Sequence, residues 1–161
     1  MPFIIQKYGG SSIGTIEKIK KVASKIIESK KNGSDIVVVV SAMQGETNRL
    51  TELAKSINVD ASGRELDTLL STGEQVTIAL LSLAISELGY KAISLTGAQA
   101  GIITSDIFNK ARIKYINSEK IKKLLRNDNI VVIAGFQGMT EQGEITTLGR
   151  GGSDTSAVAL S

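Results

Sequence analysis

Cysteine and histidine are both absent from this chain of 161 residues. Their absence excludes a disulfide framework, a thiol nucleophile, a Ser-His-Asp triad and a zinc site built from histidine or cysteine. Any metal ion would therefore be a hard cation, held by carboxylates and by the phosphates of a substrate, which favours Mg²⁺.

Tryptophan is also absent, and phenylalanine and tyrosine occur three times each. The hydrophobic residues, 42% of the chain, are thus mainly aliphatic, as is typical of the buried parallel sheet of an α/β protein. No apolar run approaches the roughly 20 residues that cross a bilayer, and the amino terminus lacks the features of a secretory signal. We expect a cytoplasmic protein that does not bind a membrane.

The excess of positive charge is small, with a formal net charge of +3. Many lysines fall at helical spacing, and no aromatic residues lie between them as a base-stacking platform would require. We therefore expect a solvated helix face and no nucleic-acid partner. The lysines concerned are Lys18, Lys20, Lys21, Lys25, Lys30 and Lys31.

Apolar strands and amphipathic helices alternate along the chain. Strands are expected at residues 3–8, 36–40, 92–95 and 130–134, and helices at 16–31, 48–57, 64–70, 74–88 and 118–126. Ser71-Thr72-Gly73 is expected to separate two helices, and residues 102–116 to be irregular. This alternation predicts an α/β fold with a mostly parallel sheet that is sandwiched between helices.

The last part of the sequence predicts a short hairpin around Gln142-Gly143 and then a helix from about Thr155. That helix stops after about two turns, at Ser161, although apolar helices in α/β proteins normally lead to another strand. We therefore expect the fold to be truncated at the carboxyl end.

Five polar, glycine-bearing loops mostly follow strands. They are KYGGSS (7–12), SAMQG (41–45), LTGAQAG (95–101), AGFQG (134–138) and LGRGGSD (148–154). Ligands in parallel sheets bind at the carboxyl ends of the strands. The pattern therefore predicts that the five loops meet at one edge of one sheet, where a ligand binds.

The first of these loops has the chemistry of a phosphate site. Adjacent glycines, Gly9 and Gly10, let backbone amides approach a phosphate without interference from a Cβ. The ammonium of Lys7 could meet a transferred phosphoryl group. Taken alone, the same residues are better explained by a tight turn between a strand and a helix.

The last loop has three glycines around Arg150, which form a possible anion-binding nest at the start of a helix. Arg150 can bind a carboxylate through two hydrogen bonds, which lysine cannot do. Ser153 and Asp154 could instead be ordinary helix caps. Two such loops in one small chain favour a ligand site over two structural turns.

No GxxxxGK[ST] and no GxGxxG sequence is present, so the chain has neither a P-loop nor the usual dinucleotide fingerprint. The chain instead resembles the aspartate kinases of the amino acid kinase family. The resemblance runs over nearly all residues, including LLSTGEQ and LTGAQAG, and its most specific part is LGRGGSD after AGFQG, together with SAMQGETN. It implies the three-layer α/β/α fold of that family.

The resemblance also implies a reaction, the transfer of the γ-phosphoryl group of ATP, bound with Mg²⁺, to the β-carboxylate of L-aspartate. The acceptor carboxylate is already ionised, so positioning and charge neutralisation suffice without a strong general base. On the nucleotide side, Lys7, Gly9, Gly10 and Ser12 would face the phosphates. Ser41 would stand near the transferred group.

On the acceptor side, the resemblance implies that Thr47 contacts aspartate, that Phe136 walls the pocket and that Arg150 binds the α-carboxylate. Glu74 would bind the amino group or orient Lys7, although it could also be an ordinary acid in the first turn of a helix. Asp154 would organise Lys7 and the phosphoryl group. Residues that complete the pocket would be Gly151, Gly152 and Ser153.

The resemblance places the adenine pocket and the regulatory ACT domains of the family beyond Ser161. Residues 1–161 are thus expected to form the amino-terminal, substrate- and phosphate-binding part of a kinase domain. Three alternatives stay open. The chain could be active only when a second polypeptide supplies the nucleotide half, it could be a fragment that folds but does not catalyse, or it could be an amino-acid- or anion-binding module. Its protein partner would be a separate carboxyl-terminal polypeptide or a second copy in a homo-oligomer.

Overall fold

The computed structural model describes residues 3–149, 155–156 and 159–160. Its main sheet has four strands, β1 (Phe3–Tyr8), β2 (Asp35–Val40), β6 (Ile130–Ala134) and β3 (Ala92–Leu95), in the order β1-β2-β6-β3. All neighbouring pairs are parallel. The predicted parallel sheet is confirmed, with strand positions within one residue of the expected ones.

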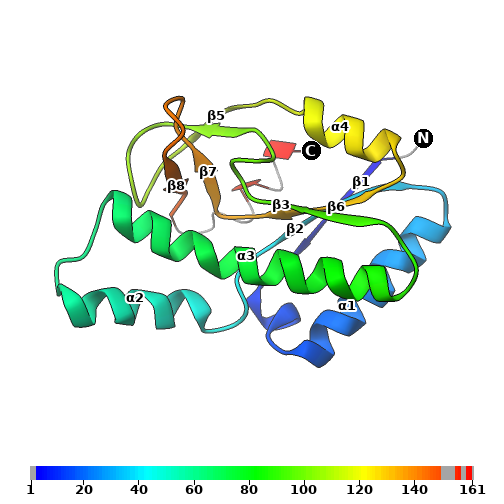
Figure 1. Ribbon diagram of the computed structural model, residues 1–161, viewed down its shortest axis with the longest axis horizontal. Coiled ribbons are helices and arrows are strands. Elements are labelled where there is room, and N and C mark those ends of the chain that lie inside the picture. The colour runs from blue at the N-terminus through cyan, green and yellow to red at the C-terminus, as the bar shows by residue number, and fades with distance from the viewer. Residues whose placement is uncertain (1–2, 150–154, 157–158, 161) are drawn as a thin grey trace.

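Helices cover both faces of this sheet, and Figure 1 shows the three layers. Alternate residues of β2 enter two separate cores, because successive side chains of a strand point to opposite faces. Val38 and Val40 pack with helices α1 (Ile16–Lys31) and α3 (Arg64–Glu87). Val37 and Val39 pack on the other face with α4 (Glu119–Arg126). The predicted α/β/α sandwich is therefore confirmed.

Helix α1 begins and ends where its sequence predicts. The side chain of Thr15 accepts a hydrogen bond from the amide of Lys18 and so caps the first turn. At the other end, Gly33 has a φ of +87°, which glycine adopts without steric cost. The apolar face of α1 is buried and is formed by Ile19, Val22, Ala23, Ile26 and Ile27.

Helix α3 is a single helix of 24 residues, so the predicted break at Ser71-Thr72-Gly73 is wrong. The hydroxyls of Ser71 and Thr72 donate to backbone carbonyls three residues earlier, at 2.8 and 2.6 Å. Gly73 lies where a Cβ would approach the Cβ of Ala42 to 3.0 Å. These three residues are therefore compatible with a helix that packs very closely on the loop after β2.

Length and composition alone would allow α3 to cross a membrane, and no other helix in the described part of the chain meets that test. The predicted break at Ser71-Thr72-Gly73 concealed this length in the sequence. Its inner face packs in the core and buries the two carboxyl groups of Asp67 and Glu74 among protein partners. The contacts are those of a core helix.

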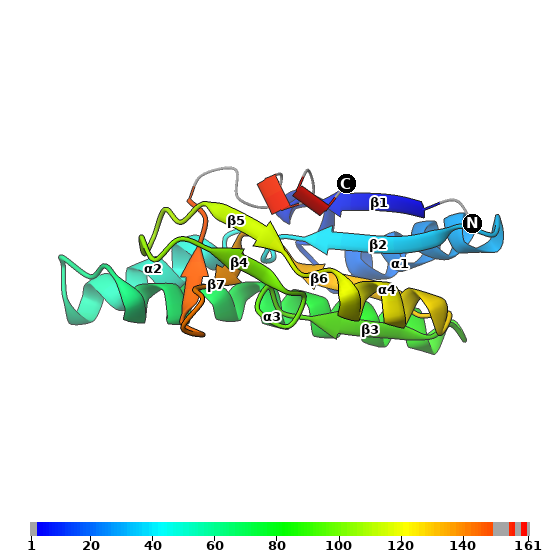
Figure 2. The ribbon, with the colours of Figure 1, turned by 90° about the horizontal axis from the view of Figure 1, so that it is seen from above.

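A second, mixed sheet occupies one end of the molecule, as Figure 2 shows. Its order is β5 (Ile113–Ile116), β4 (Ile102–Thr104), β7 (Gln137–Met139) and β8 (Ile145–Thr147). Strands β7 and β8 form the expected hairpin. The expectation of an irregular segment over 102–116 is wrong, because β4 and β5 lie there. These strands are too short for a clear period-2 pattern.

Helix α2 (Glu46–Ile57) lies beside the first half of α3, and a 3-10 helix, η1 (Gly10–Ile13), precedes α1 (Figure 1). Thr155, Ser156, Ala159 and Leu160 are helical, in agreement with the predicted last helix. The N-cap residue of α4 is Ser118, and the Oδ1 atom of the preceding Asn117 accepts from the amide of Glu119 at 3.3 Å.

Gly97 joins the two sheets and supports a stability prediction. A Cβ at this position would lie 2.2 Å from the backbone oxygen of Gln137, so Gly97→Ala must displace the main chain. We expect a loss of about 3 kcal/mol in the free energy of unfolding, measured by urea denaturation.

Gly143→Ala is the matched control for this substitution. Gly143 has a φ of +87° but open space around its Cβ position, so it should lose only about 1 kcal/mol. Equal losses for the two variants would contradict the close-approach explanation.

Candidate functional site

The carboxyl ends of the four main strands meet at one edge of the sheet. In the strand register, Tyr8 pairs with Val40 and Val40 with Ala134. The chain leaves these strands side by side, because the amide of Ser41 donates to Tyr8 O at 3.2 Å and that of Gly135 to Val40 O at 2.9 Å. The predicted gathering is therefore correct for the loops after β1, β2, β3 and β6. The fifth loop, LGRGGSD, instead follows β8 of the second sheet.

Lys7 lies at the end of β1, on an exposed position, with its ammonium above the first glycine of the loop. A Cβ added to Gly9 would lie 3.3 Å from Lys7 Nζ, so the absence of a side chain there leaves room for the ammonium. The loop then closes as η1, with the amide of Ser12 donating to Gly9 O at 3.0 Å. Lys7, Gly9, Gly10 and Ser12 thus lie together at the end of β1, and their predicted role toward phosphates stays a prediction.

The loops after β1 and β2 contact each other. A Cβ on Gly10 would lie 3.3 Å from Ala42 O, so only glycine allows this spacing without displacement. Ser41 is partly buried beside Tyr8, and it joins the same group. Thr47 follows in the first turn of α2, also partly buried.

Lys18 is a second cation at the first glycine loop that sequence reasoning missed. Its ammonium donates to Ser11 O at 2.9 Å, although it was assigned to a solvated helix face. Lys18 is seven residues after Ser11 in the sequence, but this spacing could not show that the side chain folds back onto the loop.

Glu74 is almost fully buried, with 1% of its surface exposed. Burial raises the pKa of its carboxyl to about 8, and hydrogen bonds from Gln137 and from the backbone amides of Glu74 and Ala42 partly oppose this rise. The alternative of an ordinary first-turn acid is wrong, since α3 begins ten residues earlier and carries Glu65 and Asp67 in its first turn. The raised pKa favours the protonated form of Glu74 at neutral pH, and the carboxyl is held against the loop after β2.

Gln137 fixes Glu74 and was not singled out from the sequence. Its Nε2 donates to Glu74 Oε1 at 2.8 Å and to Ser71 O at 3.0 Å, and its Oε1 accepts from the amide of Gly97 at 3.2 Å. One buried amide therefore joins α3, the loop after β3 and strand β7. Only its position in AGFQG, beside Phe136, could have drawn attention to it.

Phe136 has a φ of +72°, a conformation that is rare for a bulky residue. Both of its backbone polar groups are held. Its amide donates to Ser156 Oγ at 3.2 Å, and its carbonyl accepts from the amide of Leu148 at 2.8 Å. Strain of this kind is typical of functional sites. The two hydrogen bonds bring Leu148, the first residue of LGRGGSD, and Ser156, which follows that loop, to Phe136.

Arg150, Gly151, Gly152, Ser153 and Asp154 lie outside the described residues. Their predicted roles stay predictions. Among residues 3–149, 155–156 and 159–160, no three carboxylates gather into a cation site. Glu46 and Glu74 both lie beside the loop after β2, since Glu46 follows Gly45 at the start of α2 and Glu74 accepts from the backbone amide of Ala42.

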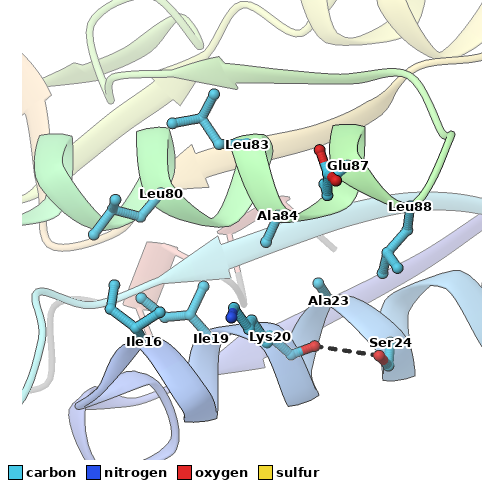
Figure 3. Close-up of a pocket in the computed structure, with 10 residues that line it drawn as sticks. All are labelled: Ile16, Ile19, Lys20, Ala23, Ser24, Leu80, Leu83, Ala84, Glu87 and Leu88. Carbon is cyan, nitrogen blue, oxygen red and sulfur yellow. Dashed lines mark hydrogen bonds between the residues drawn. The ribbon is translucent and has the colours of Figure 1, made fainter.

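A groove of about 350 Å³ lies elsewhere, between α1 and α3 (Figure 3). Its lining is mainly apolar and contains none of the predicted site residues: Ile16, Ile19, Lys20, Ala23, Ser24, Leu80, Leu83, Ala84, Glu87 and Leu88. The Ser24 hydroxyl donates within α1, to Lys20 O at 3.2 Å. The groove is therefore distinct from the loops at the sheet edge.

Comparison with known proteins agrees with this architecture. A sequence model of the amino acid kinase family matches residues 2–161. The chain belongs to the amino acid kinase family. The resemblance inferred from the sequence motifs is thereby confirmed, and so is the fold that it implied.

The most similar relatives within this family include two bacterial aspartokinases. The chain is 60% identical over 160 residues to the aspartokinase of Bacillus sp. (strain MGA3) and 58% identical to that of Geobacillus stearothermophilus. Each alignment covers 99% of this chain and 39% of the relative. The chain thus spans about two fifths of the length of these relatives.

Solved structures show the same likeness. Aspartate kinase from Synechocystis superposes with a TM-score of 0.81 at 48% identity, covering 99% of this chain and 26% of that one. E. coli aspartokinase III, solved in complex with aspartate and ADP, gives a TM-score of 0.85 at 21% identity over 99% of this chain and 46% of that one, which shows the shared fold.

Proposed function

We propose that this chain is the substrate- and phosphate-binding part of an aspartate kinase. The enzyme transfers the γ-phosphoryl group of ATP to the β-carboxylate of L-aspartate and forms 4-phospho-L-aspartate, the first step of lysine, threonine and methionine biosynthesis. One observation carries the proposal: Lys7 and the first glycine loop lie at the same sheet edge as the buried Glu74–Gln137 pair, in a chain that is 54–60% identical to bacterial aspartokinases.

The group around Lys7 is the phosphate side of the proposed site. Gly9 and Gly10 leave space for a phosphate against the backbone, and the ammonium of Lys7 above Gly9 neutralises charge on the transferred group. Ser12 and Ser41 border the same space. Lys18, folded onto Ser11, adds a second positive charge. Mg²⁺ accompanies ATP and is held mainly by its phosphates.

The group around Glu74 is the acceptor side. A carboxyl that is buried and neutral in the free protein becomes an ionised partner when the ammonium of aspartate enters, because an opposite charge favours the charged form. Phe136 forms a wall, Thr47 contacts the amino acid, and Arg150 binds the α-carboxylate with Gly151, Gly152 and Ser153 around it. Asp154 organises Lys7. The β-carboxylate is then free to attack the γ-phosphorus in line.

We propose that the adenine pocket lies on a part of the kinase fold outside these 161 residues, on the same or on a separate polypeptide. E. coli aspartokinase III, which shares the fold, was solved with aspartate and ADP bound, and this supports aspartate and ATP as the two substrates. The proposed setting is the cytoplasm, where ATP and free aspartate are both available.

The assay that tests the proposal measures ADP release by the longest natural polypeptide that contains this chain. Acceptors are L-aspartate, L-glutamate, N-acetyl-L-glutamate and carbamate, each with ATP and Mg²⁺. We expect turnover with L-aspartate only. Turnover with another acceptor would contradict the assignment. Aspartate binding without any turnover would favour the amino-acid-binding module.

Arg150→Lys tests the acceptor side separately. Lysine keeps the charge but cannot form the paired hydrogen bonds of a guanidinium with a carboxylate. We expect the KM for aspartate to rise by about tenfold to a hundredfold, with the KM for ATP within about twofold of the original value. An unchanged KM for aspartate in a folded, active variant would remove Arg150 from the carboxylate site.

A further inference from the structure

A second buried carboxylate on α3 is not part of the site described above. Asp67 has no exposed surface and accepts four hydrogen bonds. Two come from Asn109, whose amide reaches Oδ2 at 2.9 Å and whose Nδ2 reaches Oδ1 at 2.6 Å. Two come from Thr147, whose amide reaches Oδ2 at 2.9 Å and whose hydroxyl reaches Oδ1 at 2.6 Å.

These bonds join three distant segments of the chain. Asn109 also pairs with the backbone of Gly63, since its Oδ1 accepts from the Gly63 amide at 2.8 Å and its Nδ2 donates to the Gly63 carbonyl at 3.2 Å. Thr147 is the last residue of β8, and its carbonyl accepts from the amide of Ala111 at 2.9 Å. The start of α3, the loop before β5 and the end of β8 are thus held around one carboxylate.

The chemistry of Asp67 goes beyond what packing requires. A buried carboxylate is costly unless its oxygens are filled by donors at good geometry, and these four donors are neutral groups. The carboxylate therefore imposes a single arrangement on the groups that surround it, since any displacement leaves a buried charge incompletely bonded.

The hydrogen bonds of Asp67 hold Thr147, which directly precedes LGRGGSD, the loop that carries Arg150. Leu148, the residue after Thr147, donates to the carbonyl of the strained Phe136. Gly149, with a φ of +85°, lies where a Cβ would be 3.6 Å from the Cα of Lys110, against the loop that Asn109 anchors. Asp67 and Glu74 are also seven residues apart, so they lie two turns apart on one face of α3.

We propose that Asp67 is a positioning residue for the acceptor side of the site: its carboxylate fixes the end of β8, and so the place from which the segment carrying Arg150 leaves the second sheet. This inference rests on the proposed aspartate kinase function. Asp67 acts only through Thr147 and the loop at Asn109. Because Asp67 and Glu74 both lie on α3, this helix sets the distance between the end of β8 and Glu74.

A pair of threonines on β8 provides the test. Thr147→Val removes one hydrogen bond to Asp67 and keeps the shape of the side chain. Thr146→Val is the matched control, because Thr146 is equally buried but its hydroxyl bonds to Thr104 at 2.6 Å on the other side of the strand. Thr147→Ser restores the hydroxyl.

In the full-length enzyme, Thr147→Val should raise the KM for aspartate by roughly fivefold or more and leave the KM for ATP unchanged. Thr147→Ser and Thr146→Val should keep the original KM for aspartate. The proposal is overturned if a folded Thr147→Val enzyme keeps its KM for aspartate, or if Thr146→Val raises it by the same factor.

Hydrogen exchange separates this inference from the proposed function. Asp67→Asn should speed exchange of the amides of Thr147 and Leu148 and leave those of β1, β2 and β6 at their original rates. Unchanged exchange at Thr147 and Leu148 would overturn the positioning role whatever the substrate. Faster exchange in a protein that does not phosphorylate aspartate would keep the positioning role and reject the proposed function.

Discussion

Lys7→Ala is expected to lower kcat for phosphoryl transfer to aspartate by about a hundredfold to a thousandfold, while the KM for aspartate changes little. Lys7 lies at the end of β1 with its ammonium above Gly9, on the side assigned to the phosphates. In the proposed mechanism Lys7 acts on charge that develops on the transferred group, so its removal should affect the transition state more than the binding of the acceptor. Steady-state kinetics of the full-length enzyme measure both constants.

Lys21→Ala is the matched control for this prediction. Lys21 is exposed on α1, and its removal changes the net charge by the same amount without touching the glycine loop. It should keep kcat within about twofold of the original enzyme. A Lys7→Ala enzyme with full kcat would show that the ammonium has no part in the transfer.

Glu74→Gln should raise the KM for aspartate by about tenfold to a hundredfold and should also abolish most of its pH dependence between pH 6 and 8. In the original enzyme, burial holds the pKa of Glu74 at about 8, so the carboxyl must release its proton to pair with the ammonium of aspartate. Affinity for aspartate should therefore increase as pH rises toward 8. Titration calorimetry in buffers of different ionisation enthalpy measures the released proton.

Glu74 also makes the free energy of unfolding depend on pH. This free energy falls as pH rises, whereas the affinity for aspartate is expected to increase. The pKa of Glu74 is raised from 4.5 to about 8 in the folded protein, so the folded state binds one more proton than the unfolded state between these values. The contribution is fully present below about pH 4.5 and is lost as pH rises through about 8, with a slope of up to about 1.4 kcal/mol per pH unit. A flat urea stability profile over this range in the original protein would contradict the buried, neutral carboxyl.

The parts of the fold that follow strong local patterns could be predicted from the sequence. The β-branched run before Ser41 placed β2 within one residue, because a strand that is buried on both faces has a continuous apolar run. The apolar spacing of α1 placed that helix equally well, because a helix that is buried on one face has apolar residues at helical intervals. Helix α3 could not be predicted as one piece. Ser71-Thr72-Gly73 breaks most helices, and here close packing on Ala42 compensates for the glycine.

The candidate site was predictable to a similar extent. Glycine pairs and a nearby lysine carry a recognisable chemistry, but alone they favour a tight turn. The second glycine loop and the family resemblance were needed to predict the phosphate side. Gln137 and Asp67 carry none in the sequence, because an isolated glutamine or a first-turn aspartate is ordinary on a helix or strand. Their roles arise from partners 40 to 80 positions away, such as Gly97, Glu74 and Thr147, which only the folded chain brings together.

The attack of the aspartate β-carboxylate on ATP is the central claim, and one isotope experiment tests it most directly. The full-length enzyme is supplied with ATP, Mg²⁺ and L-aspartate whose β-carboxylate is labelled with ¹⁸O, and hydroxylamine is added to cleave the acyl phosphate at its carbonyl carbon. The account predicts aspartyl hydroxamate together with phosphate that carries one ¹⁸O atom from aspartate. Phosphate without ¹⁸O, or ADP release without hydroxamate, would contradict it.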